Sequence, residues 1–248
     1  MNAVSQSSPC VVGGIRIRSW KQRRNTRCGV RVIVHRSLFV LSVSLAAVCV
    51  HAPAWAGCPQ QGAADAALVL SEVARTDRVE PWVRDDERVA LVERAAKYLE
   101  SVDDYHGYNA DIGWRHGVAH GADWAMQLAL NPALGREQLD RLLHAVAVQA
   151  VPASGHAYVF GESERLARTL LFIAKRDLHS EAEWTAWFTA LSTRLGDPAL
   201  AWKDEAWLAR RHDLAAFLNV LYVETDLSED PGIARMKPGV LAALKALP

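Results

Sequence analysis

The residues with the clearest chemical potential lie in one short segment, Gly-Trp-Arg-His-Gly-Val-Ala-His-Gly-Ala-Asp-Trp at positions 113–124. His116, His120 and Asp123 follow one another at spacings of four and three residues, so on an α-helix they would share one face. Trp114 and Trp124 flank them. Because two imidazoles and a carboxylate are costly to bury without partners, we expect this His–Asp stripe (His116, His120, Asp123) to bind something.

A metal ion is one candidate. His-x-x-x-His on a helix presents two nitrogens to an ion such as zinc, and Asp123 would complete or orient the site. Gly117 stands where zinc peptidases of the His-Glu-x-x-His type carry their general base. A further ligand would have to come from another segment, and the candidates are His106, Asp104, His156 and Glu162. This interpretation gives a metal-dependent hydrolase in which a bound water is the nucleophile.

Two interpretations need no metal. In the one we favour, the stripe binds a small ligand or a protein partner without catalysis, Trp114 and Trp124 wall the site, and a later helix start supplies Glu162 or Arg165. In the other, the stripe only locks helix packing. The histidines then bond to backbone carbonyls, and Asp123 pairs with Arg165 or Arg168. Gly117 and Gly121 lie inside the expected helix and indicate close approach by a neighbour.

A second pair, His212-Asp213, is the dipeptide of the HD-type phosphohydrolases. That chemistry needs a further histidine and aspartate, which His179 and Asp226 would have to supply. The adjacent Arg210-Arg211 favours a solvated helix start instead.

The N-terminus predicts export. All eight basic residues before position 57 occur without an acidic one, and an uncharged run of 14 residues, Ser37–Val50, precedes the Ala54-Trp55-Ala56 cleavage pattern. We expect a signal peptide over residues 1–56, with a true start possible near residues 30–34, and a periplasmic or secreted product. A lipid anchor at Cys58 is the alternative.

Cleavage changes the charge and cysteine content. The full chain has 28 basic and 28 acidic residues, so loss of eight basic ones leaves a net charge of −8. An acidic chain argues against nucleic acid as a partner. Cys58 would be the one remaining cysteine, which precludes an internal disulfide, and no membrane span is expected after cleavage.

The remainder, residues 57–248, is expected to form a single all-α domain. Apolar residues recur at helical spacing, as in Leu214, Phe217, Leu218 and Leu221, and Ser180 with Glu183 forms a capping box. Short connections predict antiparallel helix hairpins, stacked as a HEAT-like α-solenoid or packed as an irregular helical bundle. The expected helices cover residues 63–78, 85–102, 113–130, 136–150, 162–177, 181–195, 206–224 and 238–246. Asp111 would cap the third of them.

The chain also resembles a bacterial family known as domain of unknown function 2785. The resemblance covers about residues 85 to 225 and rests on four blocks: Tyr105-His106-Gly107-Tyr108, Gly113-Trp114-x-His116-x-x-Ala119-His120-x-Ala122-Asp123, Gly161-Glu162-x-Glu164-Arg165-Leu166-Ala167 and Asn219-Val220-Leu221-Tyr222. His106 stands where the family pattern is expected to have arginine. The resemblance implies a shared domain and a shared site, and it supplies no chemistry.

Overall fold

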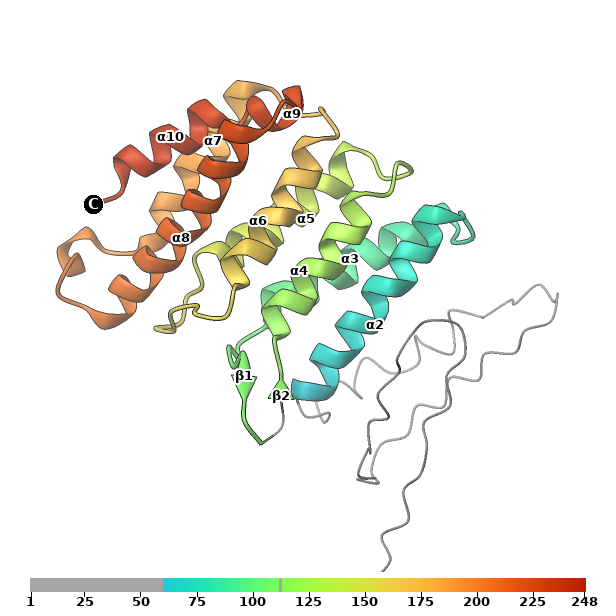
Figure 1. Cartoon of the computed structure of the whole chain (residues 1–248), viewed down its shortest axis with the longest axis horizontal. Helices are drawn as coiled ribbons and strands as arrows, with labels where there is room; N and C mark the ends of the chain where they lie inside the picture. The colour runs from blue at the N-terminus through green and yellow to red at the C-terminus, as the bar shows by residue number, and fades with distance from the viewer. Residues whose placement is uncertain (1–59, 112) are drawn as a thin grey trace, which may run out of the picture. The chain divides into compact units, whose positions relative to one another are not determined.

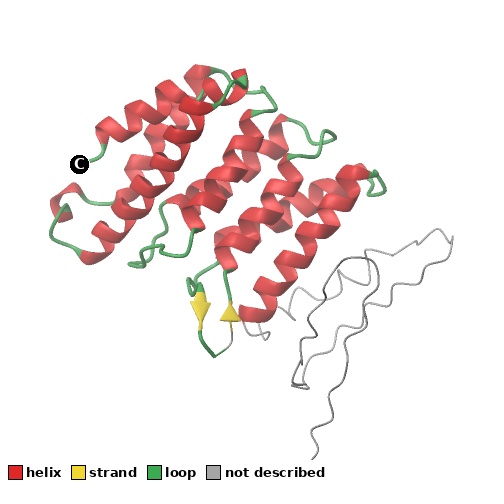
Figure 2. Cartoon of the chain, viewed as in Figure 1, coloured by secondary structure: helices red, strands yellow, loops and turns green. Residues whose placement is uncertain are grey.

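The structure is a computed structural model that describes residues 60–111 and 113–248 (Figure 1). The predicted signal peptide and Cys58 lie outside these residues. The chain divides into two units, Met1–Val50 and His51–Pro248, and every element described below belongs to the second. Figure 2 shows that this unit is built from helices and one short β-hairpin, which confirms the predicted all-α class.

The main helices are α2 (Gln60–Val79), α3 (Asp85–Ser101), α4 (Gly117–Ala129), α5 (Arg136–Ala150), α6 (Glu162–Ala174), α7 (Glu181–Ser192), α8 (Glu205–Leu227) and α10 (Lys237–Ala246). The minor elements are strands β1 (Tyr108–Asn109) and β2 (Gly113–Trp114), the short helix α9 (Pro231–Ala234), and the 3₁₀ turns η2 (Thr193–Leu195) and η3 (Pro198–Leu200).

Alternate helices pack side by side. Helix α4 contacts both α2 and α6, and α6 in turn contacts α8, so α2, α4, α6 and α8 form a row (Figure 1). Helix α3 packs against α4 and α5, and α10 packs against α7 and α8. Contact with the next-but-one helix as well as the next one is typical of stacked helix hairpins.

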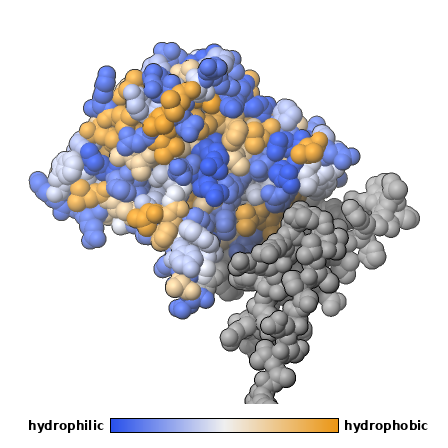
Figure 3. All heavy atoms as spheres, viewed as in Figure 1, coloured by the Kyte–Doolittle hydropathy of each residue, from blue (hydrophilic) through white to orange (hydrophobic). Residues whose placement is uncertain are grey.

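The core lies between these helices and follows the predicted apolar faces. Leu214, Phe217, Leu218 and Leu221 of α8 are all buried, as are Leu166, Leu170 and Ile173 of α6. Each such side chain contributes about 1.5–3 kcal/mol when it leaves water. The face of the unit seen in Figure 3 is a mosaic of hydrophilic side chains and small hydrophobic patches.

The bounds of the eight expected helices lie within three residues of the observed ones except at the start of α4, and the short helix α9 was not expected. The capping box at Ser180 and Glu183 is present. The helix expected at 113–130 instead begins at Gly117, its N-cap is His116 rather than Asp111, and residues 113–114 form β2. Within the described residues, no helix is both long enough and apolar enough to cross a lipid bilayer.

Candidate functional site

The β-hairpin leads the chain into α4. Tyr108 pairs with Trp114 across the two strands, and two further backbone hydrogen bonds extend the ladder, from Arg115 N to Gly107 O (2.8 Å) and from His116 N to His106 O (3.1 Å). Because successive residues of an extended segment point to opposite sides, Trp114 and His116 share one face of the hairpin and Arg115 lies on the other.

The turn at His116 corrects the sequence analysis. His116 has φ 45° and ψ 42°, a left-handed conformation, and its carbonyl accepts the first hydrogen bond of the helix from His120 N (2.9 Å). The expectation that the helix begins at residue 113 and contains His116 is therefore wrong. The strand pairing that precedes it leaves no room for another helical turn, and one left-handed residue converts the extended chain to helix.

The His116 side chain bonds to the segment that opens α6. Its Nε2 lies 3.0 Å from Phe160 O and 3.5 Å from Glu162 Oε1. Since a carbonyl can only accept, Nε2 carries the proton. Glu162 is buried, and its Oε2 accepts from Phe160 N (2.9 Å). Burial raises the pKa of Glu162, but the hydrogen bonds from His116 and the backbone outweigh it, so this pKa lies below its usual range.

His120 faces α2 instead. Its Nδ1 lies 3.0 Å from Ala64 O, so Nδ1 donates and the histidine joins α4 to α2. Burial lowers the pKa of His120, and the nearby His116 lowers it further, although the bond to Ala64 acts in the opposite direction. The imidazole is therefore held neutral at pH 7.

Asp123 faces α6. Its Oδ2 accepts from Arg165 at 2.5 Å, and one turn further on Thr169 Oγ1 donates to Ala122 O at 2.9 Å. The structure thus selects Arg165 from the two arginines that the sequence offered as partners. Together these contacts tie α4 to α6.

Each member of the His–Asp stripe therefore has a partner within the chain. Among the described residues, no group of three or more histidine, cysteine, aspartate or glutamate side chains is placed to hold a metal ion. His116 and His120 point their bonded nitrogens at two different carbonyl groups, from Phe160 and Ala64. Asp123 is engaged by a guanidinium. The described residues thus provide no complete metal site at the stripe.

The glycines of α4 let α3 approach closely, as the sequence indicated. A Cβ on Gly121 would lie 2.9 Å from Leu99 Cδ1 and 3.0 Å from the Tyr98 ring. Tyr98 also donates its hydroxyl to Gly117 O (3.2 Å). The neighbour is thus another helix of the same chain.

The two tryptophans expected to flank the stripe lie in different environments. Trp124 is 2% exposed and packs near Tyr98 in the core. Trp114 is 52% exposed, and its ring contacts Tyr108 (centroids 5.3 Å apart), His116 (4.4 Å) and Phe160 (5.9 Å). We call Tyr108, Trp114 and Phe160 the aromatic surface. Tyr108 is 52% exposed and Phe160 39%.

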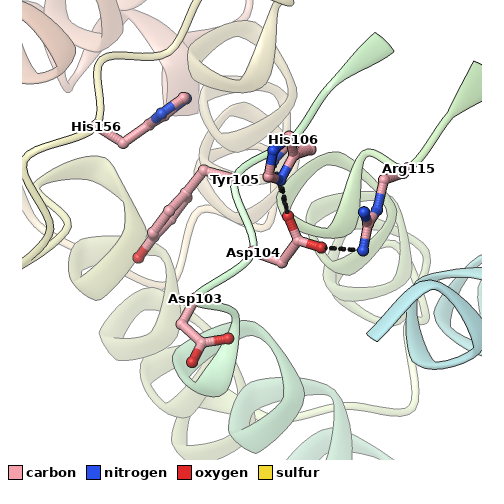
Figure 4. A pocket seen from close by; sticks show the side chains of 6 residues that line it. All are labelled: Asp103, Asp104, Tyr105, His106, Arg115 and His156. Atoms are coloured by element: carbon pink, nitrogen blue, oxygen red, sulfur yellow. Dashed lines mark hydrogen bonds and ion pairs between the residues drawn. The ribbon is translucent and has the colours of Figure 1, made fainter. Parts of the chain in front are cut away.

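Three of the residues offered as further metal ligands, Asp104, His106 and His156, line a pocket instead (Figure 4). We call it the polar pocket, and its lining is completed by Asp103, Tyr105 and Arg115. Asp104 lies between two of the other lining residues: it accepts from His106 Nδ1 (2.5 Å) and pairs with the Arg115 guanidinium. Burial raises the pKa of Asp104, but the bonds from His106 and the charge of Arg115 outweigh it and hold this pKa below its usual range.

Asp213 is fully buried, which corrects the solvated helix start expected at this position. Its Oδ1 accepts from Tyr158 N (2.8 Å), and its Oδ2 has no hydrogen-bond partner among the described residues. Burial raises the pKa of Asp213 to about 7, and Glu162 adds to the effect, although the Tyr158 bond lowers it. His179 and Asp226 pair elsewhere, with Asp140 and Lys237.

Comparison with known proteins gives a family. A family model described as protein of unknown function DUF2785 matches residues 64–223. The chain belongs to this family. No curated protein and no solved structure matches the chain. The DUF2785 match includes the His–Asp stripe, the aromatic surface, the polar pocket and Asp213.

The sequence alone assigned no role to Tyr108, Phe160 or Arg115. Tyr108 lies in one of the blocks that carry the family resemblance, which was a usable signal. Phe160 reaches His116 across 44 residues, and no local pattern predicts such a contact.

Proposed function

We propose that this DUF2785 chain is a non-catalytic binding protein whose aromatic surface docks a protein partner. The carrying observation is that Tyr108, Trp114 and Phe160 contact ring to ring and yet remain between 39% and 52% exposed. Clustered exposed aromatic side chains mark interaction sites, and tryptophan, tyrosine and phenylalanine are enriched in protein interfaces.

The aromatic surface is held rigidly from beneath. A Cβ on Gly107 would collide with the Phe160 ring, so that ring rests directly on the backbone at Gly107. The Phe160 main chain is fixed at both polar groups, since its carbonyl accepts from His116 and its N–H donates to Glu162. A preorganised surface loses less conformational entropy on binding, which favours affinity.

We assign a different role to the His–Asp stripe, that of an internal brace. His116 joins the hairpin to the start of α6, His120 joins α4 to α2, and Asp123 joins α4 to Arg165 of α6. This supports the packing interpretation for the stripe and leaves recognition to Trp114 and its two aromatic neighbours.

Panning a library of displayed peptides on the purified protein tests the proposal. We expect enriched peptides with aromatic or large apolar residues, whose affinity falls about tenfold or more in Trp114→Ala. Trp202→Ala is the matched control, because Trp202 is 60% exposed but lies between η3 and α8. The docking role would be refuted if the enriched peptides bound both variants with the same affinity as the wild type. It would also be refuted if no peptide were enriched.

Export accompanies this proposal. Residues 1–56 have the composition of a signal peptide, so we propose that the partner is met in the periplasm or outside the cell.

A further inference from the structure

Two exposed carboxylates belong to the segments that build the aromatic surface. Asp111 lies in the turn that joins β1 to β2. Glu164 belongs to the first turn of α6, and its Oε2 lies 3.8 Å from the position that a Cβ would take on Gly161, the residue after Phe160. Among the described residues, neither carboxylate has an ion-pair partner. The hairpin and the start of α6 therefore each bring an unneutralised negative charge to this part of the molecule.

The arginines closest in the chain to these segments do not offset that charge. Arg115 and Arg165 are already paired, with Asp104 and Asp123 respectively. Arg168, the next cation of α6, comes a full turn after the first turn of that helix. The electrostatic potential around the aromatic surface is therefore negative, in line with the excess of acidic over basic residues in 57–248.

The exposed rings attract the same kind of charge. The Tyr108 ring meets the Trp114 ring at 65° and the Phe160 ring meets it at 89°, so ring faces are presented in more than one direction. The face of an aromatic ring carries negative charge density, and it attracts a lysine ammonium or an arginine guanidinium within about 6 Å of its centre. Tryptophan binds cations best, and Trp114 is half exposed.

Other kinds of partner segment fit this surface less well. A purely apolar segment would take the carboxylates of Asp111 and Glu164 out of water without a counter-charge, which is costly. An acidic segment would be repelled by both carboxylates. A segment that combines apolar or aromatic anchors with lysine or arginine offers a partner to the rings and to the carboxylates alike.

We propose that the aromatic surface docks a basic segment of its protein partner, whose lysine or arginine side chains lie against the Trp114 ring and pair with Asp111 and Glu164. This partner class rests on the docking role proposed above and adds the charge of the docked segment.

The peptide library of the docking experiment gives the first test. We expect lysine and arginine to be enriched beside the aromatic or large apolar residues of the selected peptides. One selected peptide is then synthesised with a copy in which glutamine replaces every lysine and arginine. Fluorescence anisotropy measures the affinity of both for the wild type and for the double variant Asp111→Asn/Glu164→Gln, with helical content verified by circular dichroism.

We expect the wild type to bind the neutral copy about tenfold more weakly than the basic peptide, and the double variant to bind the basic peptide about tenfold more weakly than the wild type does. Raising the salt concentration from about 0.05 M to about 0.5 M should remove most of the difference between the two proteins. Glu181→Gln is the matched control and should change nothing. Glu181 is also exposed in the first turn of a helix, α7, and has no ion-pair partner within the described part of the chain.

The outcomes separate this inference from the docking role. Peptides that lose affinity in Trp114→Ala but show no excess of lysine and arginine would overturn the basic partner and leave the docking role standing. An unchanged affinity of the folded double variant for the basic peptide would have the same meaning. If no peptide is enriched, or if Trp114→Ala binds as the wild type does, the docking role fails and the basic partner fails with it.

Discussion

Replacement of Asp213 by asparagine should make the protein more resistant to alkaline conditions. Asp213 is 0% exposed, one of its oxygens has no partner among the described residues, and its pKa is raised to about 7 from 3.8. The folded state therefore binds more protons than the unfolded state between these two values. It follows that the free energy of unfolding falls as pH rises through this window. Above pH 7 the folded protein bears the full cost of holding an ionised Asp213 in its interior.

The size of the effect follows from the width of that window. Two pH units separate pH 5 from the folded-state pKa of about 7. Since one unit corresponds to roughly 1.4 kcal/mol, the free energy of unfolding of the wild type should fall by about 2–3 kcal/mol through this group. The asparagine side chain of the variant cannot ionise, and its carbonyl oxygen can still accept from Tyr158 N. Asp213→Asn should therefore match the wild type to within about 1 kcal/mol near pH 5 and exceed it near pH 8.

Urea unfolding followed by far-ultraviolet circular dichroism at both pH values measures this difference. The comparison between the two proteins isolates Asp213, because every other titrating group is common to both. If the difference in the free energy of unfolding between variant and wild type were independent of pH, the buried carboxyl would have to be ionised at little cost and the reasoning would fail.

Three further predictions concern the brace, the helix contact and export. His120→Ala should lower the free energy of unfolding by about 1–3 kcal/mol, since Ala64 O loses its donor; an unchanged urea midpoint would contradict this. Gly121→Ala should destabilise by about 1–3 kcal/mol because its Cβ would meet Leu99; a gain of about 1 kcal/mol in the same assay would show that helix propensity decides instead. The exported protein should begin at Gly57 on N-terminal sequencing, and a lipid-modified Cys58 or a retained leader would contradict cleavage after Ala56.

The helices were predictable because their signals are local. The apolar face of α8 and the capping box of α7 each depend on residues three or four apart, and both are present. The start of α4 was not predictable in the same way. The sequence Gly-Trp-x-His predicted the first turn of a helix. The pairing of Trp114 with Tyr108 instead holds this segment extended, and the backbone of His116 adopts a left-handed conformation.

The contacts of the predicted site residues were not predictable from the sequence. The partners of His116 and His120 lie 44 and 56 residues away, and only tertiary packing brings them together. Asp213 follows two arginines and a histidine in the sequence, and such a polar context predicts that its side chain is exposed to solvent. The structure buries it because Tyr158 N, from the segment that leads to α6, needs an acceptor at this point.

The central claim is that Trp114 carries recognition while the histidines only brace the fold. The most direct test measures the dissociation constant of one library-selected peptide for the wild type, Trp114→Ala and His120→Gln. We predict a loss of about tenfold or more for Trp114→Ala and no change for the folded His120→Gln. Loss of binding in His120→Gln with full affinity in Trp114→Ala would contradict the account and return the binding role to the His–Asp stripe.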